Sequence, residues 1–358
     1  MSELYTSFTD IKHFLSCQRV WKFRDDGKKF DDKSDLLVLG TEAHEIFARV
    51  LELFYSQSEQ TKEEFNLRVG GWFDEDGFIV ERLNTLEENL EDLAIDDAIS
   101  IIMRGLLGLE PWLYEPAFIP TEGLSIEFPL SWYFYVPEGR ISIRGKADAL
   151  LKEKATGAYI LVDHKFKKNI SEERDLPSMQ FVIYKEAIRQ MFGINLHALL
   201  YYEVKATAPK LPKITKDGKV SRANIVTTWE WYKSVIEITG EDPKDYDDMR
   251  VKLEARSWQE KRWVYQSPTL TENIIENIKE ICSQMLRIHR GMQKPLKVLS
   301  QHHPCVRCSY YTWCVGETRG DDMQAVEANI DFIEDDEPFR VESTTDDDLE
   351  IIIKGLEK

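Results

Sequence analysis

The sequence has 358 residues, of which 42% are hydrophobic and 31% are charged. This composition is typical of a soluble globular protein with one large domain or two ordinary ones. No run approaches the ~20 apolar residues of a membrane-spanning helix, and the first residues lack the basic and apolar regions of a signal peptide. We therefore expect a cytoplasmic protein that makes no use of a membrane. Five cysteines in such a chain argue against a disulfide framework and leave metal binding open.

The net charge of −18 is unevenly distributed along the chain. Residues 321–350 hold thirteen acidic residues and one arginine, a net charge of −12, and the last eight residues add +1. Residues 1–320 are left with −7, which is compatible with local basic patches and with a nucleic-acid partner. We expect residues 321–358 to form a flexible acidic tail.

The first half of the chain is predicted to change from helices to strands. Residues 7–23 read as one helix capped by Ser7 or Thr9, and a second helix runs from Gly40 through Tyr55. Residues 57–116 read as mainly helical, with a break near residues 70–73. The elements that follow are strands 124–136, 140–152 and 158–166, a helix over 177–192 and a strand over 196–204. This order predicts an α/β fold with a mixed central sheet flanked by helices.

The second half begins with a loop and ends with a cysteine-rich segment. Residues 206–222 are rich in proline and lysine and read as a loop. After it we expect helical stretches over 223–239 and 243–256, a short strand over 262–266, a long helix over 270–292 and the cysteine-rich segment 302–316.

Two aspartates and a lysine on the predicted strands suggest a site. Asp163 and Lys165 are two residues apart on one strand, so both side chains lie on one face and His164 points to the other. Asp148 ends the preceding strand. Two carboxylates supply hard oxygen ligands for Mg²⁺ or Mn²⁺, beside a lysine that can stabilise charge on a phosphate.

His44 lies on the second predicted helix and could add a nitrogen ligand, which favours Mn²⁺. The alternative is that Asp163 and Lys165 form a structural ion pair and that His44 is an ordinary helix histidine. Sequence spacing alone leaves both interpretations open.

Four short motifs, in this order, resemble those of one nuclease family. They are Gly40-x-x-x-His44, Gly145-Lys146-Ala147-Asp148, Asp163-His164-Lys165 and Gln180-x-x-x-Tyr184. Together they resemble the RecB-type branch of the PD-(D/E)XK nuclease superfamily, which includes AddB-type nuclease domains and CRISPR-associated RecB-like exonucleases. The resemblance spans residues 5–205, resumes at 302–316, and suggests a prokaryotic or phage source; a phage protein would act in the host cytoplasm.

The resemblance implies roles for individual residues. His44, Asp148 and Asp163 would bind the metal, and the backbone carbonyl of His164 would add a ligand. Lys165 would be catalytic together with the two aspartates. Gln180 and Tyr184 share a helix face and would complete the catalytic set over the metal; the alternative is an ordinary half-buried helix face.

Four of the five cysteines form a candidate metal-binding set. Cys305, Cys308 and Cys314 lie within ten residues, and three thiolates need a fourth ligand. Cys17 is the candidate, with His302 and His303 as alternatives. The resemblance implies a 4Fe–4S cluster that joins the N-terminal helix to the C-terminal segment, whereas spacing alone equally allows Zn²⁺.

The predicted loop is the candidate DNA-binding segment. It holds five basic residues without a regular apolar pattern: Lys210, Lys213, Lys216, Lys219 and Arg222. Such a loop can contact phosphates without reading sequence; the alternative is a solvated loop.

These features predict a metal-dependent DNA exonuclease. We expect it to hydrolyse the phosphodiester bonds of single- or double-stranded DNA ends in recombination, repair or phage DNA processing. The chain has no P-loop motif, so we expect either a stand-alone nuclease or the partner of a separate helicase, annealing or single-strand-binding protein. The alternatives are a non-catalytic DNA-end-binding or scaffold subunit, and a zinc-ribbon interaction protein.

The expected domain organisation is one nuclease domain over residues 1–320. It would carry a helical insertion over 57–116 and a basic and helical insertion over 206–262. The cysteine segment 302–316 would close this domain, and the acidic tail 321–358 would follow it.

Overall fold

The computed structural model describes most of the first 296 residues and a short C-terminal part. The described residues are 3–29, 34–57, 61–117, 126–168, 178–223, 225–265, 267–296, 305, 308–327 and 333–334. His302 and His303 lie outside them, as does nearly all of the predicted acidic tail beyond residue 327.

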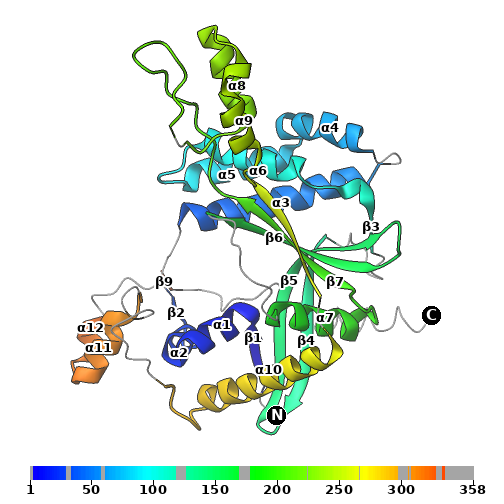
Figure 1. Ribbon diagram of the computed structural model, residues 1–358. Coiled ribbons are helices and arrows are strands. Elements are labelled where there is room, and N and C mark those ends of the chain that lie inside the picture. Colours follow the sequence, from blue (N-terminus) through cyan, green and yellow to red (C-terminus); the bar gives the residue numbers. More distant parts are fainter. Residues whose placement is uncertain are drawn as a thin grey trace.

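A mixed β-sheet divides the described part of the chain into two layers of helices (Figure 1). The strands follow the order β1-β5-β6-β7-β8, and β3 and β4 also pair with β5. Their bounds are β1 Glu3–Ser7, β3 Tyr114–Pro116, β4 Ile126–Val136, β5 Gly139–Glu153, β6 Tyr159–Lys167, β7 Ala198–Lys205 and β8 Gln259–Val264. The predicted α/β fold with a mixed central sheet flanked by helices is therefore confirmed.

The long strand β5 changes partners along its length. Its first part pairs in parallel with β1, up to Arg144, and its last part pairs antiparallel with β6, from Ala149 to Lys152. The four residues between, 145–148, have neither neighbour on that side, while β4 pairs with residues 145–147 on the other side. This gap lies in the middle of the sheet.

Four helices cover one face of the sheet: α3 Asp35–Tyr55, α4 Lys62–Glu75, α5 Gly77–Asn89 and α6 Ile95–Leu107. Their apolar sides pack with side chains of β5, β6 and β7 in one buried cluster. The helix α3 begins at Asp35, five residues before the predicted start at Gly40. The predicted break at 70–73 is wrong, because Phe65, Val69 and Phe73 form a continuous buried stripe that outweighs two glycines.

The other face is covered by α1 Phe8–Ser16, α7 Met179–Phe192 and α10 Pro268–His289. The predicted N-terminal helix is in fact two helices. Ser7 caps α1, since its Oγ accepts a hydrogen bond from the Asp10 amide (3.1 Å), and the chain then becomes extended at Cys17 before α2 Gln18–Asp25. Strand β1 was not expected; it is a short run whose Leu4 and Thr6 point into the protein.

Residues 206–264 form a peripheral unit and then return to the sheet. The loop is closed by a bridge between Ile214 and Val220, and α8 Trp229–Thr239, a 3₁₀ turn Pro243–Tyr246 and α9 Asp247–Glu254 follow. Val220 packs into a small cluster with Tyr232 and Tyr246. Because β8 pairs with β7 from Gln259 onward, the end of the predicted insertion 206–262 belongs to the central sheet.

The N-terminal helices contact the C-terminal segment through aromatic rings. Phe23 of α2 stacks on Tyr310 at 5.1 Å and meets Trp313 edge to face at 5.6 Å. Trp313 lies on α11 Tyr311–Arg319, which α12 Met323–Glu327 follows. A two-stranded pairing of β2 Lys28–Lys29 with β9 Ile333–Glu334 lies nearby.

In the part of the chain that the structure describes, no helix combines the length and apolar character required to cross a lipid bilayer.

Candidate metal-dependent active site

The site begins where β5 and β6 separate. The two strands pair up to Ala149 and Val162, and beyond this point β6 pairs only with β7 on its other side. The backbone N–H of His164 therefore has no strand partner, and it donates instead to Asp148 Oδ2 at 2.5 Å. A buried carboxylate thus takes the place of a strand at the fork between β5 and β6.

Two imidazoles meet the same carboxylate. His44 Nδ1, from α3, lies 3.3 Å from Asp148 Oδ2, and His164 Nδ1 lies 3.5 Å from it. Among the described residues, these three form the one group of three or more histidine, cysteine or carboxylate side chains close enough to share an ion. The prediction used the His164 carbonyl and put its side chain on the far face; the structure brings the ring itself to Asp148.

The electrostatics of the group favour a carboxylate between imidazoles. Burial would raise the pKa of Asp148, but the charge and hydrogen bond of His44 outweigh burial and lower it. Burial tends to lower the pKa of His44, and Asp148 raises it overall. Burial lowers the pKa of His164 to about 4, so this ring is neutral at pH 7 and keeps a lone pair for a metal.

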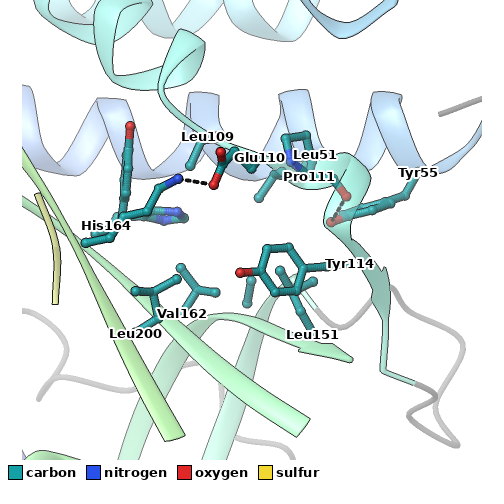
Figure 2. A pocket seen from close by; sticks show the side chains of 13 residues that line it. Leu51, Tyr55, Leu109, Glu110, Pro111, Tyr114, Leu151, Val162, His164 and Leu200 are labelled. Atoms are coloured by element: carbon teal, nitrogen blue, oxygen red, sulfur yellow. Dashed lines mark hydrogen bonds and ion pairs between the residues drawn. The ribbon is translucent and has the colours of Figure 1, made fainter. Parts of the chain in front are cut away.

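Figure 2 shows what lies on the other side of His164. The ring borders a largely apolar pocket between α3 and the sheet, whose walls include Leu109, Tyr114 and Val162. Phe47 packs against the ring edge to face at 5.0 Å. His164 Nε2 is buried and has no hydrogen-bond partner among the described residues. These contacts fix the ring with Nδ1 toward Asp148.

Asp163 and Lys165 lie on the opposite face of β6, as predicted. Lys165 Nζ contacts Asp163 Oδ2 at 2.7 Å. Burial and the negative charge of Asp148 raise the pKa of Asp163 despite this lysine. Burial opposes the charge of Lys165, but the two aspartates raise its pKa, so the lysine is cationic at pH 7.

Gln180 and Tyr184 of α7 form hydrogen bonds beside the Asp163–Lys165 ion pair. Gln180 Nε2 donates to Asp163 Oδ1 at 2.9 Å and to Tyr184 Oη at 3.0 Å. Tyr184 Oη donates to the carbonyl of Lys146 at 3.3 Å, in the part of β5 that has neither β1 nor β6 beside it. The helix therefore connects the Asp163 side of the site to the backbone beside Asp148.

Sequence reasoning missed Glu127. Its Oε1 lies 3.9 Å from His44 Nδ1, and its Oε2 lies 2.7 Å from Lys146 Nζ. Burial and the charge of Asp148 raise the pKa of Glu127 to about 7. One signal could have found it: Glu127 is the sole charged residue in the strand Ile126–Val136.

The four predicted cysteine ligands are all described, and none forms a disulfide. Cys17 lies between α1 and α2, and Cys308 and Cys314 flank Tyr310 in the aromatic contact. Burial raises the pKa of Cys308, and the nearby thiols of Cys17 and Cys305 raise it further. The described cysteines do not form a group close enough to share one ion.

The five predicted DNA-binding residues are exposed and divide into two groups. Arg222 bonds to Asp248 at 2.9 Å and to the carbonyl of Asp245, so it anchors the loop to α9. The other four are the lysines that project from the loop into solvent: Lys210, Lys213, Lys216 and Lys219.

Residues 5–315 of the chain match the family model of the PD-(D/E)XK nuclease superfamily. A crystal structure from Eubacterium rectale, of a protein provisionally named an exonuclease, aligns with a TM-score of 0.44 and 12% identity over 83% of this chain and 86% of that one. The crystal structure of SSO0001 aligns with a TM-score of 0.19 and 15% identity over 56% of this chain and 85% of that one. No curated protein sequence matches.

We predict that Mn²⁺ raises the melting temperature of the protein through this site. A ligand that binds only the folded state adds about 2.7 kcal/mol at a concentration one hundred times its Kd. Thermal unfolding with increasing Mn²⁺ should show a rise for the wild type and little for Asp148→Asn. The control is Glu186→Gln, which changes a buried carboxylate of α7 outside the group. An equal rise in Asp148→Asn would contradict the assignment.

Proposed function

Because the chain belongs to the PD-(D/E)XK nuclease superfamily, we propose that it is a divalent-metal-dependent DNA exonuclease of the RecB-type branch. The observation that supports this most strongly is the convergence at one fork of the sheet. His44 and Asp148 meet there on one side, and Asp163, Lys165 and Gln180 meet on the other. The order of the four motifs supports the RecB-type branch and an expected role at DNA ends in recombination, repair or phage DNA processing.

The donor set fits a divalent cation. Members of the superfamily generally use divalent metals, and carboxylate oxygens with imidazole nitrogens suit Mg²⁺ or Mn²⁺. His164 is neutral, its ring is fixed beside Asp148, and Asp148 is charged. When bound, the cation would acidify a water and neutralise charge on the phosphate.

Lys165 supplies the fixed positive charge. The half-exposed ammonium is held by Asp163 and remains protonated, so it can bind a phosphate oxygen or orient a water for attack. Gln180 holds Asp163 in place through a hydrogen bond and is itself held by Tyr184. We assign Gln180 and Tyr184 the task of positioning this pair.

Replacing either Asp163 or Lys165 should abolish DNA cleavage while DNA binding is retained. Asp163→Ala and Lys165→Ala should each lower the cleavage rate of end-labelled linear DNA by at least about 10²-fold, the effect typical of one electrostatic group. The measurement is cleavage in Mg²⁺ and in Mn²⁺, beside DNA binding by the same variants in Ca²⁺.

Covalently closed circles are the control for the exonuclease assignment. Cleavage of linear DNA alone supports an exonuclease, and cleavage of circles would identify an endonuclease. Wild-type rates in both variants would contradict the site. Binding without cleavage by the wild type, at any metal concentration, would favour the end-binding scaffold instead.

We also propose that the cysteines hold a 4Fe–4S cluster. The thiols of Cys17 and Cys305 lie close enough to Cys308 to raise its pKa, and Phe23, Tyr310 and Trp313 connect the same two segments. Such a connection closes a very long loop, which favours the folded state. Zn²⁺ is the alternative occupant.

Metal analysis of anaerobically purified protein tests this. The wild type should contain about four iron atoms per chain, as a 4Fe–4S cluster requires, with the visible absorption of a cluster. Cys308→Ser should lose most of the iron and melt at a lower temperature. Cys282→Ser is the control, because Cys282 is buried in α10 among apolar residues. Stoichiometric zinc without iron would establish the alternative, and an unchanged iron content in Cys308→Ser would exclude this cysteine as a ligand.

The loop lysines are proposed to bind DNA phosphates. The four lysines are exposed. The end of their loop is anchored by the Arg222–Asp248 ion pair and by Val220 in the small apolar cluster, so their positive charges face solvent. Binding of this kind is independent of sequence and sensitive to salt.

Replacing Lys213, Lys216 and Lys219 together with alanine should weaken DNA binding and reduce its salt dependence. The slope of log K against log salt should fall by about 0.9 for each duplex phosphate that the lysines no longer neutralise, while the cleavage rate at saturating DNA stays the same. Lys279→Ala on α10 is the control. An unchanged slope would show that the loop does not touch the substrate.

A further inference from the structure

We propose that Glu127 is a further ligand residue of the same site, and that its carboxylate binds the divalent cation together with His44 and Asp148. This inference rests on the proposed metal-dependent function. Neither the four motifs nor the group of three potential ligands includes Glu127, and the case for it comes from its place in the sheet, its contacts and its backbone.

The register of the sheet brings Glu127 level with Asp148 along the strands. In the antiparallel pair of β4 and β5, Ile126 faces Ala149 and Phe128 faces Ala147, so Glu127 and Asp148 are the residues between these two pairs. Glu127 therefore lies beside Asp148 on the β4 side, and His164 lies beside Asp148 on the β6 side.

The backbone at Glu127 reverses the alternation of the strand. Residues two apart normally share a face, yet Ile126 belongs to the cluster under α3–α6 and Phe128 to the cluster under α7 and α10. On β5, Ala149 likewise belongs to the cluster under α3–α6, and Ala147 to the cluster under α7 and α10. Both strands thus change faces at the Glu127–Asp148 pair.

This reversal uses a conformation that glycine would adopt more readily. Glu127 has a φ of 50°, and among the described residues it is the one non-glycine residue with positive φ. The strand therefore holds a charged side chain at a position where the backbone favours glycine. Such a backbone persists only where the surrounding structure holds it in place.

The side chain is aimed at the ligand group. It is 13% exposed, with Oε1 toward His44 at 3.9 Å and Oε2 on Lys146 at 2.7 Å. Lys146 is half-exposed and has a second partner in Glu45, at 3.2 Å, so it can remain paired if Glu127 turns to an ion.

The resulting donor set is two carboxylates with imidazole nitrogen. Mg²⁺ and Mn²⁺ prefer six ligands and usually keep several waters, so a third protein ligand beside His44 and Asp148 is compatible with their coordination. Lys146 would continue to offset part of the negative charge. The residues of the four motifs lie on α3, β5, β6 and α7. Glu127 would add a ligand from β4.

The test is Mn²⁺ affinity of the metal-depleted full-length protein, measured from the free Mn²⁺ signal in electron paramagnetic resonance. Glu127→Gln removes the charge, and Glu127→Gly removes the side chain while relaxing the backbone. Glu45→Gln is the matched control, because Glu45 shares the contact with Lys146. Thermal unfolding without metal is measured in parallel.

We expect both Glu127 variants to raise the Kd for Mn²⁺ by about tenfold or more, the effect typical of residues around a metal site. Glu45→Gln should keep the wild-type Kd, and Glu127→Gly should melt at or above the wild-type temperature. A purely structural role for Glu127 would not change Mn²⁺ affinity in a variant that is as stable as the wild type.

Wild-type affinity in both Glu127 variants would overturn this inference and leave the proposed function intact. An equal loss in Glu45→Gln would also overturn it, because the effect would then belong to Lys146. A wild-type protein that binds no Mn²⁺ would remove the metal site itself, and with it both the inference and the proposed function.

Discussion

The hydrogen bond from the His164 backbone to Asp148 is the interaction on which the rest of the site depends. It forms because β5 and β6 separate after Ala149 and Val162, which leaves a buried N–H without a strand to receive it. A carboxylate that accepts such a bond contributes about 1.5–3 kcal/mol, and an unsatisfied buried N–H would cost a similar amount. The same bond places the Asp148 charge at the fork.

Two separate hydrophobic cores bring ligands to this fork. The core under α3–α6 fixes His44 and the ring of His164, and the core under α7 and α10 fixes Gln180 and Tyr184. Close packing in the first core depends on Gly105, where a Cβ would lie 2.7 Å from the Phe47 ring. Phe47 in turn packs on His164. The position of the imidazole thus depends on packing well away from the metal-binding atoms.

The sequence was sufficient for the parts of the site that follow from strand and helix periodicity. Period two put Asp163 and Lys165 on one face, and the i, i+4 spacing put Gln180 and Tyr184 together. Both arrangements are present. The central order of helix, meander, helix and strand also agrees, because each of these elements has a strong apolar pattern of its own.

The features that sequence reasoning missed are those that depend on non-local pairing. Strand β1 is only five residues long, and its partner lies more than 130 residues later in the chain. Asp148 meets the ring of His164 at the point where β4 and β5 change faces, which no regular periodicity predicts. The continuous helix α4 likewise reflects tertiary packing of Phe65, Val69 and Phe73 over local glycine preference.

The central claim is that one divalent cation site lies at the fork, between the two cores. Anomalous diffraction from crystals soaked in Mn²⁺ tests it most directly. A peak within coordination distance of Asp148, with His44 as its neighbour, is the expected result. A peak at another place in the protein, with an empty fork in well-ordered density, would contradict the account.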